Sequence, residues 1–144
     1  MKIIVSGVGV DNARVATQTL IDAYDISDED IYLNIGICAA SKQFCIGELL
    51  SIGSICYHKK ITHLKDSLLS LLTLDEQSSI ESAPIVDMEA YGFYDAIIHS
   101  PAIKNFYIFK VVSDHFEPYM VTKDLTKKLI FNQIDAINNS IKLI

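Results

Sequence analysis

Short β-branched runs and a helical pattern alternate along the first part of the chain. Residues 2–6 form a β-branched run that ends in a Gly-Val-Gly turn, after which Asp11 caps a predicted helix. The positions of this helix that we expect to face inward recur at helical spacing: Val15, Ala16, Thr19, Leu20 and Ala23. A second apolar run at 31–35 stops at Gly36. The pattern therefore predicts a strand, a helix and a second strand, with parallel pairing of the two strands.

The middle of the chain predicts two extended segments and two helices. Residues 49–56 form an extended segment in which Gly53 marks a bend or bulge, and residues 64–72 form a short predicted helix. A brief apolar stretch at 85–88 leads into a predicted helix from 89 to 99. That helix is so apolar that we expect it to be buried on most sides.

The last part of the chain predicts a central strand and a long final helix. Residues 105–112 form the most apolar run, which only Lys110 interrupts, so we expect a central strand there. From residue 121 onward, apolar residues at helical spacing mark one helix: Leu125, Leu129, Ile130, Ile134, Ile137 and Ile141. Strands that alternate with helices predict an α/β fold, a single domain over residues 1–144 with three layers and a central mixed, mostly parallel sheet flanked by helices.

Composition and charge narrow the possible partners. The chain has 144 residues, of which 50% are hydrophobic and 21% are charged, which is typical of one globular domain. Its formal net charge of −6, without a long run of lysine or arginine, disfavours nucleic acid and anionic membrane surfaces as partners. No apolar run approaches the roughly 20 residues of a membrane helix, and glycines interrupt the N-terminal apolar run before a signal-peptide core forms. We therefore expect a cytoplasmic protein.

The three cysteines, Cys38, Cys45 and Cys56, show neither a disulfide framework nor the Cys-x-x-Cys spacing of a zinc site. We expect reduced thiols, no bound metal and no organic cofactor. A cysteine hydrolase is disfavoured, because no Gly-x-Ser-x-Gly or comparable elbow accompanies Cys38, Cys45 or His115.

Candidate chemistry lies just past the carboxyl ends of the predicted strands, where α/β sheets bind ligands. The turn at Gly7 and Gly9 lacks the third glycine of a phosphate-binding pattern, so a simple tight turn is favoured. Asp87 is well placed to cap the helix that follows it. Glu89 opens that apolar helix, so it either stays structural or accepts hydrogen bonds from ligand hydroxyls.

Ser113 and Asp114 directly follow the most apolar strand. A carboxyl group in a low-dielectric cleft at such a position can have a raised pKa and donate a proton. Ser and Asp are equally common as caps of a following turn. The residues alone leave the proton donor and the cap as equal alternatives for Asp114.

Four blocks of sequence, taken in order, resemble the superfamily of purine nucleoside phosphorylases, uridine phosphorylases and methylthioadenosine/S-adenosylhomocysteine nucleosidases. In their order and spacing the blocks extend over most of the chain, from residue 6 to residue 114. They are Ser6 to Ala13, Ile31 to Ala40, Ile46 to Leu50, and Val86 to Ala90 paired with Val111 to Asp114. The resemblance implies a phosphorylase/hydrolase-like fold and a purine-type nucleoside as the small-molecule ligand.

The resemblance also implies roles for individual residues. In the nucleosidase branch, the positions of Met88 and Glu89 contact the ribose, and the position of Asp114 protonates the purine at N7. The predicted substrate-binding set is completed by Ser113, Gly36 and Ile37. Cleavage of an N-glycosidic bond builds positive charge on the ribose and negative charge on the base, so an anion near the sugar and an acid near the base both lower the barrier.

Hydrolysis is favoured over phosphorolysis, because the position of Asn34 carries a phosphate-binding arginine in some phosphorylases. The matching blocks begin after the N-terminal strand region that supplies, in relatives, the glutamate that activates water, so we expect a domain without that region.

The leading hypothesis is a purine-type nucleoside N-ribosyl hydrolase with Asp114 as its acid. The alternative is a catalytically inactive nucleoside-binding or regulatory protein that retains the fold. A third is a structural subunit whose apolar helix from 89 to 99 forms a dimer interface. Each is expected to form a homo-oligomer, a dimer, that binds neither nucleic acid nor membranes.

Overall fold

The computed structural model describes residues 1–65 and 67–142. The strands, in chain order, are β1 (Ile31–Ala40), β2 (Leu49–Ser51), β3 (Ser54–Tyr57), β4 (Lys60–His63), β5 (Ser70–Thr73), β6 (Ile85–Asp87) and β7 (Asn105–Asp114). The helices are α1 (Val10–Ala23), α2 (Ala90–Ile98), the short 3-10 helix η1 (Pro118–Met120), α3 (Lys123–Asn132) and α4 (Ile134–Lys142).

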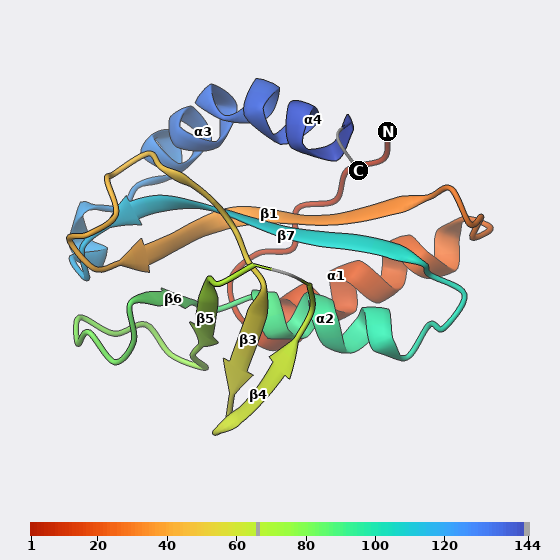
Figure 1. The fold of residues 1–144 in the computed structure, drawn as a ribbon, viewed down its shortest axis with the longest axis horizontal. Helices are drawn as coiled ribbons and strands as arrows, with labels where there is room; N and C mark the ends of the chain where they lie inside the picture. The colour runs from red at the N-terminus through yellow and green to blue at the C-terminus, as the bar shows by residue number, and fades with distance from the viewer. Residues whose placement is uncertain (66, 143–144) are drawn as a thin grey trace.

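The strands form one sheet in the order β2-β7-β1-β6-β5-β3-β4. β1 and β7 pair in parallel along nearly their whole length, and β3–β5 and β5–β6 are also parallel. The other pairings, β1–β6, β2–β7 and β3–β4, are antiparallel. In Figure 1, α1 and α2 lie on one side of the β1–β7 pair, and α3 and α4 lie on the other. The predicted α/β fold with three layers and a mixed sheet is confirmed.

The hydrophobic core lies between the sheet and α2. Buried side chains of β1, β7 and α2 form it together, among them Cys38, Ile108, Val112, Phe93 and Ile97. The carboxyl-terminal part of β7 is buried without interruption up to its last residue. The apolar strand predicted at 105–112 and the buried helix predicted at 89–99 are therefore both confirmed.

Helices α1 and α2 approach each other closely at Gly92. A Cβ atom at Gly92 would lie 2.0 Å from the carbonyl oxygen of Val10, so only glycine allows this contact. The buried residues of α1 are Val10, Ala13, Ala16 and Ile21. The prediction of which side of α1 faces inward was wrong in part. The side of α1 that packs against α2 is a different one, and three residues of the predicted inward side are exposed: Val15, Thr19 and Ala23.

Residues 2–6 do not form the predicted strand. Ile3 and Val5 are 75% and 91% exposed, and within the described residues no strand pairs with this run. A β-branched run becomes a strand only where another strand supplies its hydrogen bonds, and the partners of β1 are β7 and β6 instead. The predicted unit of strand, helix and parallel strand at the N-terminus was therefore wrong.

Two further helix predictions differ from the structure. Residues 64–72, apart from residue 66, which lies outside the described residues, contain no helix, and the segment ends in β5, which is paired with both β3 and β6. The final helix is two helices, α3 and α4, which are separated at Gln133. The bend predicted at Gly53 is confirmed, because it separates β2 from β3.

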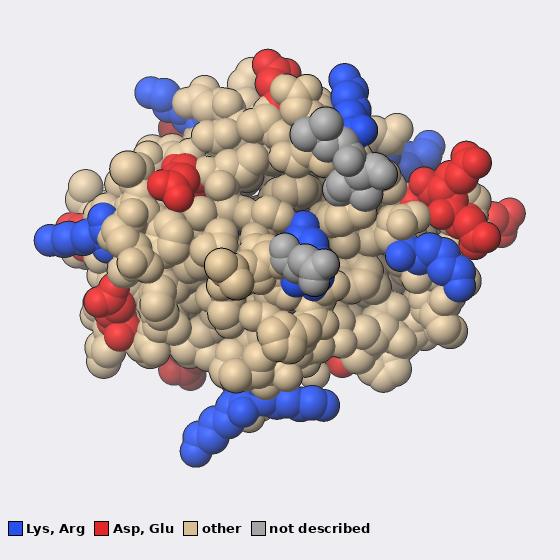
Figure 2. Space-filling model, in the orientation of Figure 1, with Lys and Arg blue, Asp and Glu red and all other residues tan. Residues whose placement is uncertain are grey.

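The surface carries charges of both signs. On the face shown in Figure 2, basic side chains stand singly or in small groups among acidic ones, and they do not merge into one basic patch. Within residues 1–65 and 67–142, none of the helices combines the length and the apolar character needed to cross a bilayer.

Candidate active site

Asp87, the last residue of β6, is a buried carboxylate with protein donors on both oxygens. Its Oδ1 accepts a hydrogen bond from Thr73 Oγ1 at 2.9 Å. Its Oδ2 accepts hydrogen bonds from the backbone N–H groups of Ala90 at 2.8 Å and Glu89 at 3.2 Å. Asp87 therefore caps the start of α2, as the sequence predicted, because these N–H groups have no partner within the helix.

Lys110 forms a buried ion pair with Asp87. Its Nζ lies 2.8 Å from Asp87 Oδ2, and the two side chains are 1% and 0% exposed. The distance between Lys110 Nζ and Asp87 Oδ2 is short, but the angles at these atoms are not those of a hydrogen bond. No other described residue accepts a hydrogen bond from Nζ. Among the described residues, the buried ammonium therefore has Asp87 as its close charged partner.

Gly36 makes room for this ammonium. Gly36 lies opposite Lys110 in the β1–β7 register, and a Cβ atom there would lie 3.1 Å from Lys110 Nζ. In the sequence, Lys110 stands out only as an interruption of an apolar strand. A lone charge in such a run is itself a signal, because a buried charge requires a partner.

Glu89 stands next to this ion pair, half-buried at the start of α2. Its Oε2 accepts a hydrogen bond from the N–H of Gly9 at 2.9 Å. Burial raises the pKa of Glu89 and the charge of Asp87 acts in the same direction, whereas Lys110 and the Gly9 N–H oppose the increase. The glycine turn, with φ of +79° at Gly7 and +102° at Gly9, thus binds a carboxylate of the protein.

Asp114 ends β7 and is 7% exposed. Its Oδ1 lies 2.5 Å from the hydroxyl of Ser113, which also lies 3.1 Å from the carbonyl oxygen of Cys38. Its Oδ2 accepts a hydrogen bond from the N–H of Glu117 at 2.9 Å. The carboxylate therefore caps the turn after β7, and its burial is also what the proton-donor hypothesis requires.

The buried thiol of Cys38 is influenced by the charges of both the Asp87–Lys110 pair and Asp114. Burial raises its pKa to about 12, and the charges of Lys110, Asp87 and Asp114 also act on it. Asp87 ends β6, Asp114 ends β7, and Lys110 lies four residues before that end and contacts Asp87. Because the thiolate is the reactive form of cysteine, Cys38 is not suited to act as a nucleophile.

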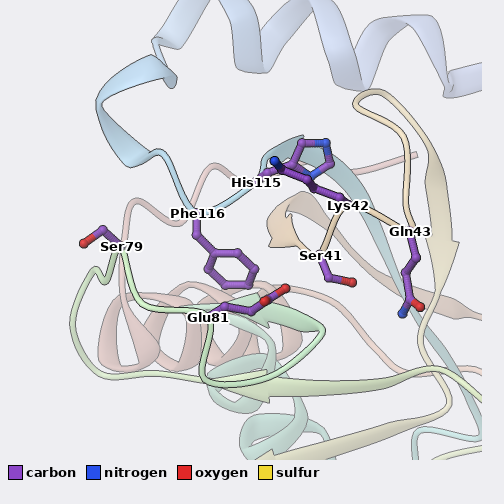
Figure 3. Close-up of a pocket in the computed structure, with 7 residues that line it drawn as sticks. All are labelled: Ser41, Lys42, Gln43, Ser79, Glu81, His115 and Phe116. Carbon is purple, nitrogen blue, oxygen red and sulfur yellow. The ribbon is translucent and has the colours of Figure 1, made fainter.

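Two open depressions border these groups. One of about 520 Å³ adjoins the chain just after Asp114, and Figure 3 shows the residues that line it: Ser41, Lys42, Gln43, Ser79, Glu81, His115 and Phe116. The other, of about 380 Å³, includes Gly9 and is closed on one side by Tyr57 and Asp75, whose side chains are hydrogen-bonded. Asp114 and Glu89 are not themselves among the lining residues; His115, next to Asp114, lines the first depression, and Gly9, which is hydrogen-bonded to Glu89, lines the second, so the action of both carboxylates on one ligand remains a prediction.

Of the other predicted substrate-binding residues, Met88 lies between β6 and α2, Ile37 lies on β1, and Ser113 lies on β7. Met88 and Ile37 are half-buried, and Ser113 is buried beside Asp114. Within the part of the chain that the structure describes, no group of three or more His, Cys, Asp and Glu side chains could hold a metal ion.

Comparison with known proteins gives matches only in structure. No protein-family model matches the sequence, and no curated protein matches it. A 5′-methylthioadenosine/S-adenosylhomocysteine nucleosidase from Colwellia psychrerythraea, in complex with adenine, matches with a TM-score of 0.64 and 17% identity over 88% of this chain and 74% of that one.

Two further structures match more closely in shape. Futalosine hydrolase of Helicobacter pylori matches with a TM-score of 0.75 and 13% identity, over 96% of this chain and 78% of that one. A nucleosidase of the same methylthioadenosine type from Chlamydia trachomatis matches with a TM-score of 0.70 and 17% identity, over 96% and 76% of the two chains.

Proposed function

We propose that this chain, which has the fold of the methylthioadenosine/S-adenosylhomocysteine nucleosidases, binds a purine-type nucleoside and hydrolyses its N-ribosyl bond. The observation that carries the proposal is the half-buried carboxylate of Glu89, held by the Gly9 N–H beside the buried pair of Asp87 and Lys110. This carboxylate keeps lone pairs that can accept hydrogen bonds from ribose hydroxyls.

In the proposed reaction, the bond between ribose C1′ and the purine nitrogen breaks and its electron pair passes to the base. Asp114 donates a proton to N7 of the base, which neutralises the charge that develops there. The negative charge of Glu89 stabilises the positive charge that develops on the ribose. The oxygen of a water forms the new bond to C1′, and the proton that this water loses passes to the solvent, from which Asp114 is protonated again. Met88, Ser113, Gly36 and Ile37 are proposed to line the ligand.

Water is the proposed acceptor because the one arginine of the chain is already engaged. Arg14 contacts Asp11 and Asp95, both at 2.6 Å, and is therefore not free to bind phosphate. A second candidate function, nucleoside binding without turnover, is favoured by a different observation. Both carboxylate oxygens of Asp114 already have protein partners, Ser113 and Glu117, which suits a structural carboxylate.

Base release separates the two functions. The protein is incubated with methylthioadenosine, S-adenosylhomocysteine, adenosine and inosine, with and without phosphate. We expect release of base without phosphate, and a decrease of about a hundredfold or more for Asp114→Asn, because an amide cannot donate an acidic proton. Asp124→Asn, at an exposed position of α3, is the matched control and should leave the rate unchanged.

Ligand-dependent thermal stabilisation without base release would support the binding protein instead. Absence of both effects with all four nucleosides would contradict both functions.

We also propose that the protein works as a homodimer in the cytoplasm. Most apolar side chains of α2 pack within the chain, against α1 and the sheet, and Ile98 is its exposed one, so we place the interface on another surface. Sedimentation at micromolar concentration should give about twice the monomer mass of 16.1 kDa. A single monomeric species would exclude the dimer.

A further inference from the structure

Glu89 stands at the start of α2 without capping the helix. The first backbone N–H groups of α2 are bound by Asp87 Oδ2, which accepts hydrogen bonds from Ala90 at 2.8 Å and from Glu89 itself at 3.2 Å. The Glu89 side chain makes no cap hydrogen bond, and its Oε2 accepts the N–H of Gly9 instead. Asp87 therefore fixes the backbone from which the Glu89 carboxylate projects, and that carboxylate is not used by the helix.

The carboxylates of Asp87 and Glu89 share one buried cation. Lys110 Nζ lies 2.8 Å from Asp87 Oδ2, and the charge of Lys110 also acts on Glu89. Two neighbouring carboxylates each disfavour the ionised form of the other, and a cation beside them offsets this effect. The side chains of Asp87 and Lys110 are 0% and 1% exposed, so solvent ions screen these charges little.

The charges that act on Glu89 come from two strands of the sheet. They belong to Asp87, at the end of β6, and to Lys110, on β7, and the N–H of Gly9 is the polar group that joins them. The charged side chains of the neighbouring helix α1 are engaged in ion pairs of their own, each at 2.6 Å: Arg14 with Asp11, and Arg14 with Asp95.

We infer that Lys110 and Asp87 are positioning residues that set the charge with which Glu89 meets the ribose. Asp87 holds the backbone of Glu89 and raises the pKa of its carboxyl group, whereas Lys110 lowers that pKa and has the larger effect of the two. The pair therefore keeps Glu89 ionised to a lower pH than burial alone would allow. An ionised carboxylate accepts stronger hydrogen bonds from ribose hydroxyls than a neutral acid does. The inference rests on the proposed function.

The charge of Glu89 is measured without a ligand, by NMR of the side-chain carboxyl carbon during a pH titration, and Glu89→Gln identifies its resonance. Lys110→Met should raise the titration midpoint by about one pH unit, and Asp87→Asn should lower it by a smaller amount. The amide oxygen of asparagine still accepts the N–H groups of α2, so Asp87→Asn removes the charge and retains the cap. Lys128→Met, at an exposed position of α3, is the matched control and should leave the midpoint unchanged.

The opposite directions distinguish this role from a structural one. Both substitutions break the same ion pair, so a pair that only stabilises the fold would not move the midpoint of Glu89 up in one variant and down in the other. Binding of adenosine should follow the same midpoints. Calorimetry in an Asp114→Asn background, where turnover is prevented, should show affinity that falls by about tenfold as Glu89 is protonated, at a higher pH for Lys110→Met than for the parent protein.

A double variant keeps the inference testable if Lys110→Met does not fold. Lys110→Met combined with Asp87→Asn leaves no unpaired charge, and its midpoint should still lie above that of the parent protein, because the larger effect is lost. Midpoints that stay in place, or that move in the same direction in both single variants, overturn the inference and leave the proposed function standing. If the midpoints move in opposite directions but none of the four nucleosides binds at any pH, the proposed function fails and the inference fails with it.

Discussion

Replacement of Lys110 by methionine is expected to lower the free energy of unfolding by about 3–5 kcal/mol. Methionine fills a similar volume, so the cost arises from the carboxylate of Asp87, which stays buried without its cation. The hydrogen bonds from Thr73 and from the start of α2 remain and compensate for only part of this loss. Urea-induced unfolding at neutral pH measures the change.

Two comparisons make this result specific to the ion pair. Lys128→Met, at an exposed position of α3, should change the free energy of unfolding by less than about 0.5 kcal/mol. The double variant Lys110→Met with Asp87→Asn should lose less than the sum of the two single variants, because it leaves no unpaired charge. A loss below about 1 kcal/mol for Lys110→Met would show that the pair contributes little to stability.

The elements that the sequence predicted well are those with one dominant local signal. β7 and α2 are apolar on most of their sides, so they become buried whichever element packs against them. The cap at Asp87 was predictable for the same reason, since a carboxylate before a helix finds its N–H donors within three residues.

The failures concern segments whose structure depends on distant partners. Residues 2–6 have the composition of a strand but, within the described residues, no strand pairs with them. Residues 70–72, the end of the segment predicted as helix, lie instead in β5, which is held in the sheet by β3 and β6. Strand pairing is non-local, and it overrides local propensity in both directions.

The candidate site shows the same division. Glu89 and Asp114 were predictable as carboxylates at element ends. The ion pair of Lys110 with Asp87 joins side chains of β7 and β6, which are separated in the sheet by β1, so no spacing in the sequence indicates it. A site assembled across strands is therefore visible to sequence reasoning only as separate charged residues.

Glu89→Gln is expected to weaken nucleoside binding by about tenfold or more, because hydrogen bonds to a charged group are stronger than those to a neutral amide. The amide oxygen of glutamine still accepts the hydrogen bond from Gly9, so the turn should stay in place. Free adenine lacks the ribose and should bind equally well to both proteins. Calorimetry with adenosine and adenine measures the contrast, and Glu76→Gln, at an exposed position, is the matched control. An equal loss of affinity for adenine would contradict a role in sugar binding.

The same substitution should make the protein more stable at neutral pH. Burial raises the pKa of Glu89 in the folded state above its ordinary value of 4.5, so between these two pKa values the folded state holds more protons than the unfolded state. Stability of the parent protein therefore falls as the pH rises through this interval, whereas that of Glu89→Gln does not. The two proteins should be equally stable below pH 4.5 and diverge above it, with the variant the more stable. A carboxylate that decreases stability at neutral pH is what selection for function, rather than for stability, would retain, which agrees with the sugar-binding role proposed for Glu89.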